Sequence, residues 1–304
     1  CIRDRNYAYY VLRHSSATTP TIATLHETKS GKELRTLQDN AELRERLAKL
    51  SYGPKEFFTV RTADGVELNA WMVKPADFNA KKKYPVLMTQ YSGPNSQSVL
   101  DRFEFGWEEC LAAHGVITVC VDGRGTGARG EEFRKCTYLK MGDLESKDQV
   151  AAAKALAKQF PFIDASRMAI WGWSFGGYNT LMSMSVGEGT FKVGIAVAPP
   201  TDWHYYNTIY TERYMRTPKE NAEGYALTSP IKLAEKLTGK LLLIHGTADD
   251  NVHFMQTMDY AETLVQLGKQ FDMQVYKDRN HFIMGGNTRL HLYTRMTDFI
   301  LENL

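Results

Sequence analysis

A serine flanked by glycines is the pattern in this chain that points most directly to chemistry. Ser174 lies in Gly-Trp-Ser-Phe-Gly-Gly at 172–177, which follows the apolar run 168–171 and precedes the small-residue segment 178–185. A strand, then G-x-S-x-G, then a helix is typical of a nucleophile elbow, a sharp turn that lifts a serine hydroxyl off a sheet. The glycines let neighbouring backbone approach without a Cβ clash. The pattern predicts acyl transfer through Ser174.

The serine needs a base and an acid, and the chain offers both in a suitable order. A serine hydroxyl is a weak nucleophile until a base takes its proton, and an acid must orient that base. In this architecture the order is serine, acid, histidine, each after a strand. Asp249 and Asp250 follow the apolar run 241–245, and His281 follows the run 273–276. We therefore predict His281 as base. Asp249 is the preferred acid because it lies nearer the strand end, with Asp250 as its competitor.

Hydrolysis also needs hydrogen-bond donors for the charge that develops on the carbonyl oxygen. The backbone N–H of Phe175, directly after the serine, is one expected donor. The chain has no His-Gly-Gly-Gly loop to supply a second one. At the matching strand end lies Gln-Tyr-Ser-Gly-Pro at 90–94. The Tyr91 phenol is a candidate donor there, and a Tyr91 that only packs against its neighbours is an equal alternative.

Two further patterns are better explained by structure than by chemistry. His245, Asp249, Asp250 and His253 are metal-ligand types, but a metal there would leave the serine elbow without its acid. We expect no metal and no cofactor, and we interpret His245, inside a strand, as a packed core histidine. Residues 125–130 match G-x-G-x-x-G, but charged residues follow them instead of an apolar helix, so we interpret them as a tight loop.

Composition excludes several classes of protein. The 304 residues carry 37 Lys and Arg against 35 Asp and Glu, which gives no electrostatic case for nucleic acid. The hydrophobic fraction of 43% and the charged fraction of 24% are ordinary for a globular protein and argue against disorder. No apolar run reaches the ~18 residues of a membrane-spanning helix. Four cysteines without C-x-x-C spacing predict neither a disulfide framework nor a zinc site.

The elements that must position these residues can be placed by their periodicity. Residues 1–38 contain three short β runs, too few to close a core of their own, and 41–50 form a short amphipathic helix. From about residue 55, apolar strands alternate with helical segments, which predicts a mostly parallel sheet covered by helices on both faces. The expected strands are 57–61, 66–73, 85–90, 115–121, 167–173, 193–198, 241–245 and 272–276. The expected helices are 103–114, 143–160 with Asp143 as a candidate N-cap, 178–185, 255–267 and 288–304.

Several motifs together resemble the prolyl oligopeptidase family. They are Gly-Trp-Ser-Phe-Gly-Gly-Tyr at 172–178, Asp-Gly-Arg-Gly-Thr-Gly at 122–127 and Tyr-Thr-Glu-Arg-Tyr at 210–214, and the segment 245–253 is similar to the dipeptidyl peptidase IV branch. The resemblance implies an α/β-hydrolase catalytic domain at 55–304 and a connector helix at 39–54. It also implies that 1–38 are the last strands of a truncated N-terminal β-propeller, in agreement with a start that has no initiator Met.

The same resemblance implies an activity and its residues. The expected activity is that of a serine exopeptidase that releases X-Pro or X-Ala dipeptides from peptide amino termini through an acyl-enzyme. Ser174, Asp249 and His281 would form the triad, and Tyr91 would be the second oxyanion donor. Asn251 would contact the carbonyl of the residue before proline. A pocket for the proline ring would be lined by Phe175, Trp203, Tyr206, Tyr210 and Val252. From the residues alone, the aromatic segment 203–210 is either core or a substrate pocket.

Departures from the family and rival interpretations remain. Phe175 stands where the dipeptidyl branch usually has Tyr, Pro200 replaces an aliphatic residue of the pocket wall, and Phe282 stands where Gly is common. The paired glutamates that hold the substrate amino terminus in that branch would lie in the propeller, outside this sequence.

The rivals are a prolyl tripeptidyl or acylaminoacyl peptidase, an esterase and a catalytically silent binding module. The closing helix is core or the face of a homodimer, and the implied location is the periplasm or the cell exterior.

Overall fold

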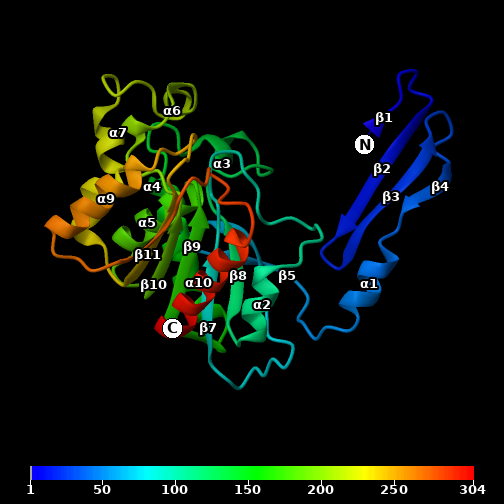
Figure 1. Ribbon diagram of the computed structural model, residues 1–304, viewed down its shortest axis with the longest axis horizontal. Coiled ribbons are helices and arrows are strands. Elements are labelled where there is room, and N and C mark those ends of the chain that lie inside the picture. Colours follow the sequence, from blue (N-terminus) through cyan, green and yellow to red (C-terminus); the bar gives the residue numbers. More distant parts are fainter. Residues whose placement is uncertain (1) are drawn as a thin grey trace.

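The computed structural model describes residues 2–304, which form two separate sheets (Figure 1). The smaller sheet is antiparallel, lies at the N-terminal end and has the order β1-β2-β3-β4. Its strands are β1 (Ile2–Arg3), β2 (Tyr9–Ser16), β3 (Thr19–Glu27) and β4 (Glu33–Gln38). The helix α1 (Ala41–Leu47) connects it to the rest of the chain. The three strands expected in this segment are present, and β1 adds a fourth.

The larger sheet has eight strands in the order β12-β11-β10-β9-β7-β8-β6-β5. Strand β7 pairs parallel with β8 on one side and with β9 on the other, and the parallel pairing continues from β9 to β10, β11 and β12. Strand β6 pairs antiparallel with β5 and β8. The central strands are continuous apolar runs because both faces of the sheet are covered. The strands are β5 (Glu56–Arg61), β6 (Glu67–Val73), β7 (Tyr84–Thr89), β8 (Ile117–Asp122), β9 (Ile163–Trp173), β10 (Val193–Val197), β11 (Lys240–Gly246) and β12 (Asp272–Tyr276).

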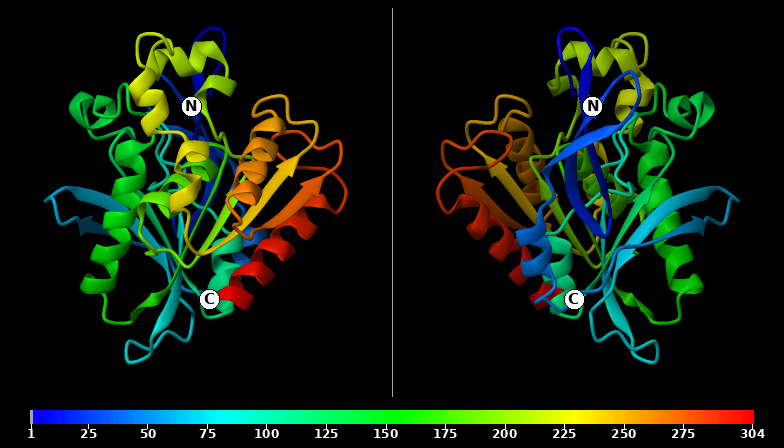
Figure 2. Two further views of the ribbon diagram at one scale, coloured as in Figure 1. Left: turned by 90° about the vertical axis from the view of Figure 1, so that its left-hand side faces the viewer. Right: turned by 90° about the vertical axis from the view of Figure 1, so that its right-hand side faces the viewer.

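Helices cover both faces of this sheet. Buried side chains of α4 (Asp143–Gln159), α5 (Phe175–Val186) and α9 (Met255–Gln266) pack on one face, and those of α2 (Trp107–Ala113) and α10 (Thr288–Asn303) pack on the other. Figure 2 shows α4 and α10 on opposite sides of the strands. The α/β-hydrolase fold expected from the sequence is therefore confirmed.

Short helices surround one end of the sheet (Figure 1). The loop after β10 contains η1 (Trp203–Tyr205), α6 (Thr208–Met215), α7 (Ala222–Leu227), α8 (Pro230–Leu233) and η2 (Ala234–Lys236). The helix α3 (Glu131–Lys135) follows β8. None of the helices in the described part of the chain has both the length and the apolar character needed to cross a bilayer.

Three helix starts differ from the sequence predictions, of which α5 begins at Phe175 instead of Tyr178 and the other two share one cause. The expected helix at 103–114 begins only at Trp107, because the Gly106 N–H donates to Glu109 Oε2 at 2.7 Å and ends the preceding loop there. Asp143 was expected to cap α4, but it is the first helical residue. The cap is Gly142, which has a φ of 108° and donates its N–H to Glu145 Oε2 at 2.8 Å. In both helices the carboxylate three residues inside the helix satisfies the N–H that precedes it.

Candidate active site

Ser174 lies at a strained turn between β9 and α5. Its φ of 58° and ψ of −119° are outside the regions that residues with a Cβ usually adopt. Such a conformation costs roughly 1–3 kcal/mol and persists only where surrounding structure holds it. Here the Ser174 N–H donates to the Val197 carbonyl at the end of β10, at 2.8 Å. The turn therefore presents the serine at the carboxyl ends of the parallel strands.

Close backbone packing explains the glycines around the serine. A Cβ added to Gly172 would lie 2.3 Å from the carbonyl carbon of Gly176, and one added to Gly176 would lie 2.5 Å from the Gln90 carbonyl oxygen. The Gln90 side-chain amide also donates to the Gly176 carbonyl at 2.8 Å. The elbow is thus packed directly against the end of β7, where only glycine leaves room.

Asp249 and His281, the acid and the base that the chain order predicts, contact each other. His281 Nδ1 lies 2.7 Å from Asp249 Oδ2, and both residues are buried. A carboxylate can only accept, so Nδ1 carries the proton and Nε2 is left as a base. The His281 carbonyl accepts a hydrogen bond from Trp173 Nε1 at 2.9 Å, which places His281 beside the residue before Ser174. Asp250, the competing acid, is exposed.

The Asp249 carboxylate receives three further hydrogen bonds. The N–H groups of Asn251 and Val252 donate to Oδ1, each at 2.9 Å, and His245 Nε2 lies 3.1 Å from Oδ2. Burial alone would raise the pKa of Asp249, but the hydrogen bonds from His245 and His281 bring that pKa below its ordinary value. Asp249 is therefore ionised at neutral pH.

Sequence reasoning missed the contact of His245 with the acid. His245 is fully buried, as expected of a core histidine, but it also contacts Asp249. Its Nε2 faces two acceptors, Asp249 Oδ2 and the Val252 carbonyl at 2.9 Å, so Nε2 carries the proton. Its Nδ1 then accepts from the Thr257 hydroxyl at 2.7 Å. The signal in the sequence was the histidine at the end of the strand, four residues before the acid.

Tyr91 and Phe175 lie close to each other beside Ser174. Their ring centroids are 6.0 Å apart, and both residues line one cavity with Ser174. Burial and the nearby Tyr206 raise the pKa of Tyr91, and a hydrogen bond with Ser174 lowers it in part, with a net rise. The Tyr91 phenol therefore stays protonated at neutral pH and can donate a hydrogen bond. Phe175 is buried and is the first residue of α5.

That cavity is small, about 30 Å³, and its walls are mostly aromatic. Successive rings meet at an angle, for example Trp203 with Tyr206 at 75° and Tyr206 with Tyr210 at 88°. Its lining residues are Tyr91, Ser174, Phe175, Pro200, Trp203, Tyr206 and Tyr210. The structure thus brings most of the expected pocket residues together around Ser174, and Pro200 lies in the wall where the sequence predicts it.

Neither Asn251 nor Val252 is among the residues that line the cavity. Asn251 Oδ1 accepts a hydrogen bond of 2.7 Å from the Tyr206 hydroxyl. The Val252 side chain is fully buried, and its backbone N–H and carbonyl contact Asp249 and His245. Val252 therefore supports the acid loop in this structure.

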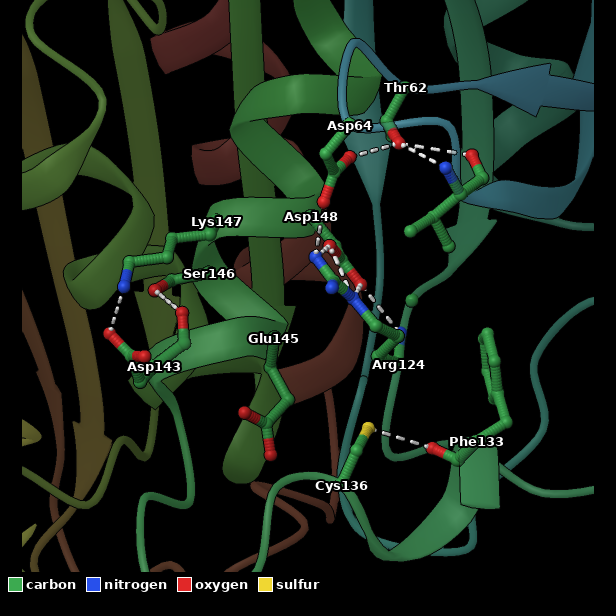
Figure 3. A network of polar contacts seen from close by, with 12 residues as sticks. Thr62, Asp64, Arg124, Phe133, Cys136, Asp143, Glu145, Ser146, Lys147 and Asp148 are labelled. Carbon is green, nitrogen blue, oxygen red and sulfur yellow. Dashed lines mark hydrogen bonds and ion pairs between the residues drawn. The ribbon is translucent and has the colours of Figure 1, made fainter. Parts of the chain in front are cut away.

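The Asp-Gly-Arg motif that begins at Asp122 has a structural role here. The Asp122 carboxylate accepts the backbone N–H groups of Ser98 and Val99, at 3.0 and 2.8 Å. Arg124 pairs with the fully buried Asp148 of α4, with Nη2 2.5 Å from Oδ1 (Figure 3). The Asp122 contacts hold the loop after β7 to the end of β8, and the Arg124–Asp148 pair holds the chain after β8 against α4.

The G-x-G-x-x-G match at 125–130 is the loop that the sequence predicted. It leads into α3, a helix of only five residues with no buried side chain, whereas a dinucleotide site needs a helix packed on the sheet. Among the residues that the structure describes, no group of three or more His, Cys, Asp or Glu side chains is arranged to hold a metal ion.

Comparisons with known proteins show what this chain is similar to. The family model of the prolyl oligopeptidase family matches residues 103–304. Dipeptidyl peptidase 4 of Felis catus is 40% identical over 303 residues, covering 97% of this chain and 39% of the relative. Prolyl endopeptidase FAP of Bos taurus is 41% identical over 285 residues, covering 92% of this chain and 37% of the relative.

Solved structures give the same result. The crystal structure of Porphyromonas gingivalis dipeptidyl peptidase 4 matches with a TM-score of 0.97 and 59% identity, over 98% of this chain and 42% of that one. A putative dipeptidyl aminopeptidase IV from Bacteroides ovatus matches with a TM-score of 0.91 and 34% identity, over 99% of this chain and 43% of that one. The chain thus spans about two fifths of the length of these relatives.

Proposed function

The chain belongs to the prolyl oligopeptidase family, and from this premise we propose that it is the catalytic part of a serine exopeptidase that releases X-Pro or X-Ala dipeptides. The observation that carries the proposal is the 2.7 Å contact between His281 Nδ1 and Asp249 Oδ2. The Trp173 indole donates to the His281 carbonyl and so holds this pair beside the Ser174 elbow. The names of the dipeptidyl peptidase relatives support dipeptide release, and the name of the prolyl endopeptidase supports cleavage at proline.

Each residue of the proposed mechanism has a defined task. His281 Nε2 takes the proton of Ser174 as Ser174 Oγ attacks the substrate carbonyl, and Asp249 stabilises the imidazolium that forms. The Phe175 N–H and the Tyr91 phenol donate to the oxyanion. His281 then protonates the leaving amine, and water hydrolyses the acyl-enzyme. Phe175 supplies its backbone N–H as a tyrosine would, without the extra hydroxyl.

The cavity beside Ser174 supports a proline ring or an alanine methyl at the cleaved position. It is small and walled by Pro200 and by the rings of Trp203, Tyr206 and Tyr210, so it favours a compact apolar group. Asn251 uses its Oδ1 to accept from Tyr206, which leaves its amide N–H groups to donate to the carbonyl of the preceding substrate residue.

The segments before residue 55 have a proposed place in the larger protein. We assign 1–38 to the last strands of an N-terminal β-propeller and 39–54 to a connector. The shared length with the relatives, about two fifths, supports a further domain. In the dipeptidyl branch that domain would bind the substrate amino terminus. The proposed location is the periplasm or the cell exterior, and a homodimer remains part of the proposal.

The test uses the full-length protein with Gly-Pro-nitroanilide and with a proline-containing peptide. We expect release of nitroaniline and a product mass equal to an N-terminal dipeptide. Ser174→Ala should abolish both activities and the labelling by a fluorophosphonate probe, whereas Ser30→Ala, in an exposed turn, should retain them. Full activity of Ser174→Ala would overturn the assignment. A tripeptide or an acylated amino acid as product would instead favour a tripeptidyl or acylaminoacyl peptidase.

A further inference from the structure

A second cavity, of about 530 Å³, lies on the face of the sheet that α2 and α10 cover. Its walls come from the start of α2, from β9 and from α10. The lining residues are Gly106, Trp107, Glu108, Cys110, Trp171 and Tyr293. The proposed mechanism uses none of them, and the cavity is much larger than the one beside Ser174.

Three aromatic rings meet at this cavity. Trp107 packs edge-on against Trp171, with ring centroids 5.0 Å apart at 88°, and lies 5.5 Å from the Tyr293 ring at 50°. A hydrogen bond of 2.8 Å from Trp107 Nε1 to Thr297 Oγ1 fixes the central ring. Rings that meet at different angles present π-faces in several directions, which is how aromatic cages bind organic cations.

One carboxylate at this cavity, Glu108, offers a partner for a cation. Glu108 lines it, and burial, followed by the nearby Glu109 and Glu104, raises the pKa of Glu108, while Lys55 lowers it in part. The two neighbouring carboxylates already have partners, because Glu109 accepts the Gly106 N–H and Glu104 lies 3.5 Å from Lys55. This leaves the Glu108 carboxylate to meet a ligand. A bound cation would favour the ionised form of Glu108.

The Trp171 indole provides a second kind of contact. Its Nε1 is buried and has no hydrogen-bond acceptor among the described residues. A buried donor without an acceptor costs free energy, and a carbonyl oxygen of a ligand would satisfy it once the cavity wall opens to the indole. A peptide segment with a basic side chain offers both a cation and carbonyl oxygens.

A row of rings connects this cavity to the candidate active site. Trp171 and Trp173 are two residues apart on β9, so their side chains lie on the same face of the sheet, roughly 6.6 Å apart. Trp173 precedes Ser174 and contacts His281. Arg289 lies 4.8 Å above the Trp173 ring and 5.9 Å from the Tyr293 ring, so these two rings already bind one cation and a second would use the faces of Trp107 and Trp171.

We propose that the cavity between α2 and α10, lined by Trp107, Trp171, Tyr293 and Glu108, binds a Lys or Arg side chain of the peptide's leaving group. This inference rests on the proposed function, because His281 protonates the leaving amine and the leaving group therefore lies on the His281 and Trp173 side of Ser174. Trp171 is three residues from Ser174, roughly 10 Å, which an extended peptide covers in about three residues. The second or third residue after the cleaved bond would reach the cavity.

The experiment measures kcat/KM of the full-length protein for hexapeptides that begin with Gly-Pro, followed by four alanines. Lys, norleucine or Glu replaces one alanine at a time. We expect Lys to exceed norleucine about threefold to tenfold at the second or third position after the cleaved bond. Glu108→Gln should reduce this preference to less than about twofold, because the ring faces remain and the charge is lost. Glu302→Gln, an exposed carboxylate on α10 outside the cavity, should leave it unchanged.

Hydrolysis of Gly-Pro-nitroanilide separates this proposal from the proposed function, since its leaving group is too short to reach the cavity. If the wild type fails to cleave it, the proposed function fails. If the wild type cleaves it and hydrolyses the Lys, norleucine and Glu peptides equally at every position, only the cation site is overturned. A Lys preference that survives Glu108→Gln, or binding of tetramethylammonium at the cavity without any peptide preference, also overturns it.

Discussion

At the scale of single residues, the Asp249 carboxylate is the most heavily constrained group of the candidate site. Two backbone N–H groups and two imidazoles donate to its two oxygens. His245 is itself held by the Thr257 hydroxyl, so a buried chain of hydrogen bonds runs from α9 to His281. The acid is thereby fixed in both position and ionisation. We assign His245 as a positioning residue for the proposed triad.

This assignment predicts the effect of His245→Leu. The variant leaves Asp249 Oδ2 with one donor fewer, and a hydrogen bond to a charged group contributes about 1.5–3 kcal/mol. We expect kcat to fall roughly 10-fold to 100-fold, with KM for Gly-Pro-nitroanilide little changed. His245→Gln, whose amide can donate, should recover part of kcat. Circular dichroism checks the fold of each variant, and a folded His245→Leu with wild-type kcat would contradict the role.

At the scale of elements, the nucleophile elbow depends on how closely β9, α5 and the end of β7 approach. The contacts that a Cβ on Gly172 would make are all with the backbone of Gly176, so no side-chain rotation can relieve them. The turn and the start of α5 would have to move together. The position of Ser174 is therefore tied to the packing of three elements.

Gly172→Ala tests this coupling through stability. We expect the free energy of unfolding in urea to fall by more than about 3 kcal/mol, the upper range for overpacked cores. Gly106→Ala is a matched control, because no atom lies within 4 Å of a Cβ added at that position and its φ of −174° is extended backbone. We expect that control to stay close to wild type. An equally small change in Gly172→Ala would show that the elbow can relax.

The sequence predicted the central elements well, because their signals are local. Continuous apolar runs marked the buried strands, and the helix periodicity marked α4, α9 and α10 within a few residues. The helices α6, α7 and α8 were not predicted, because they have only four to eight residues and depend on the packing around them. Their N-caps, Asn207, Asn221 and Ser229, accept backbone N–H groups and were the available signal.

The candidate site was predictable in part for the same reason. The G-x-S-x-G motif and the order of acid and base are readable along the chain, and the structure brings Asp249 and His281 into contact. The contact of His245 with Asp249 was not predicted, because a histidine inside an apolar strand has the same local pattern whether or not it faces the acid. The aromatic cavity between α2 and α10 joins residues more than 180 positions apart, which no local pattern reveals.

At the scale of the whole molecule, the two sheets differ in how well they are covered. The central strands of the large sheet are buried on both faces, whereas β4 is exposed along its whole length and the N-terminal sheet leaves Tyr9, Leu12 and Leu34 more than 40% exposed. One hydrogen bond of 2.6 Å, from the Ala17 N–H to Asp101 Oδ1, joins the two parts. Incomplete coverage of the small sheet supports the proposal that further strands pack on it.

Inside the covered part, one carboxyl group links global stability to pH. Glu145 of α4 is fully buried and lies close to the Arg124–Asp148 pair (Figure 3). Burial raises the pKa of Glu145 to about 8, although the hydrogen bond from the Gly142 N–H opposes this rise. Its pKa in the unfolded chain is close to the ordinary value of about 4.3. Between about pH 4.3 and pH 8, the Glu145 carboxyl therefore keeps its proton in the folded form and has lost it in the unfolded form.

This difference predicts that Glu145 lowers stability as pH rises. Below about pH 4 the carboxyl is protonated in both forms and has no effect, and between about pH 4.3 and 8 each pH unit costs the folded form up to about 1.4 kcal/mol. Glu145→Gln stays neutral and keeps an oxygen that can accept the Gly142 N–H. We expect its advantage in free energy of unfolding, measured in urea, to grow steadily from pH 5 to pH 8.

The depressed pKa of Asp249 and the raised pKa of Asp122 are shared by both proteins and cancel in the comparison. Glu45→Gln, at an exposed site, should show no such trend, and a stability difference for Glu145→Gln that is constant across this range would contradict a protonated Glu145 in the folded core.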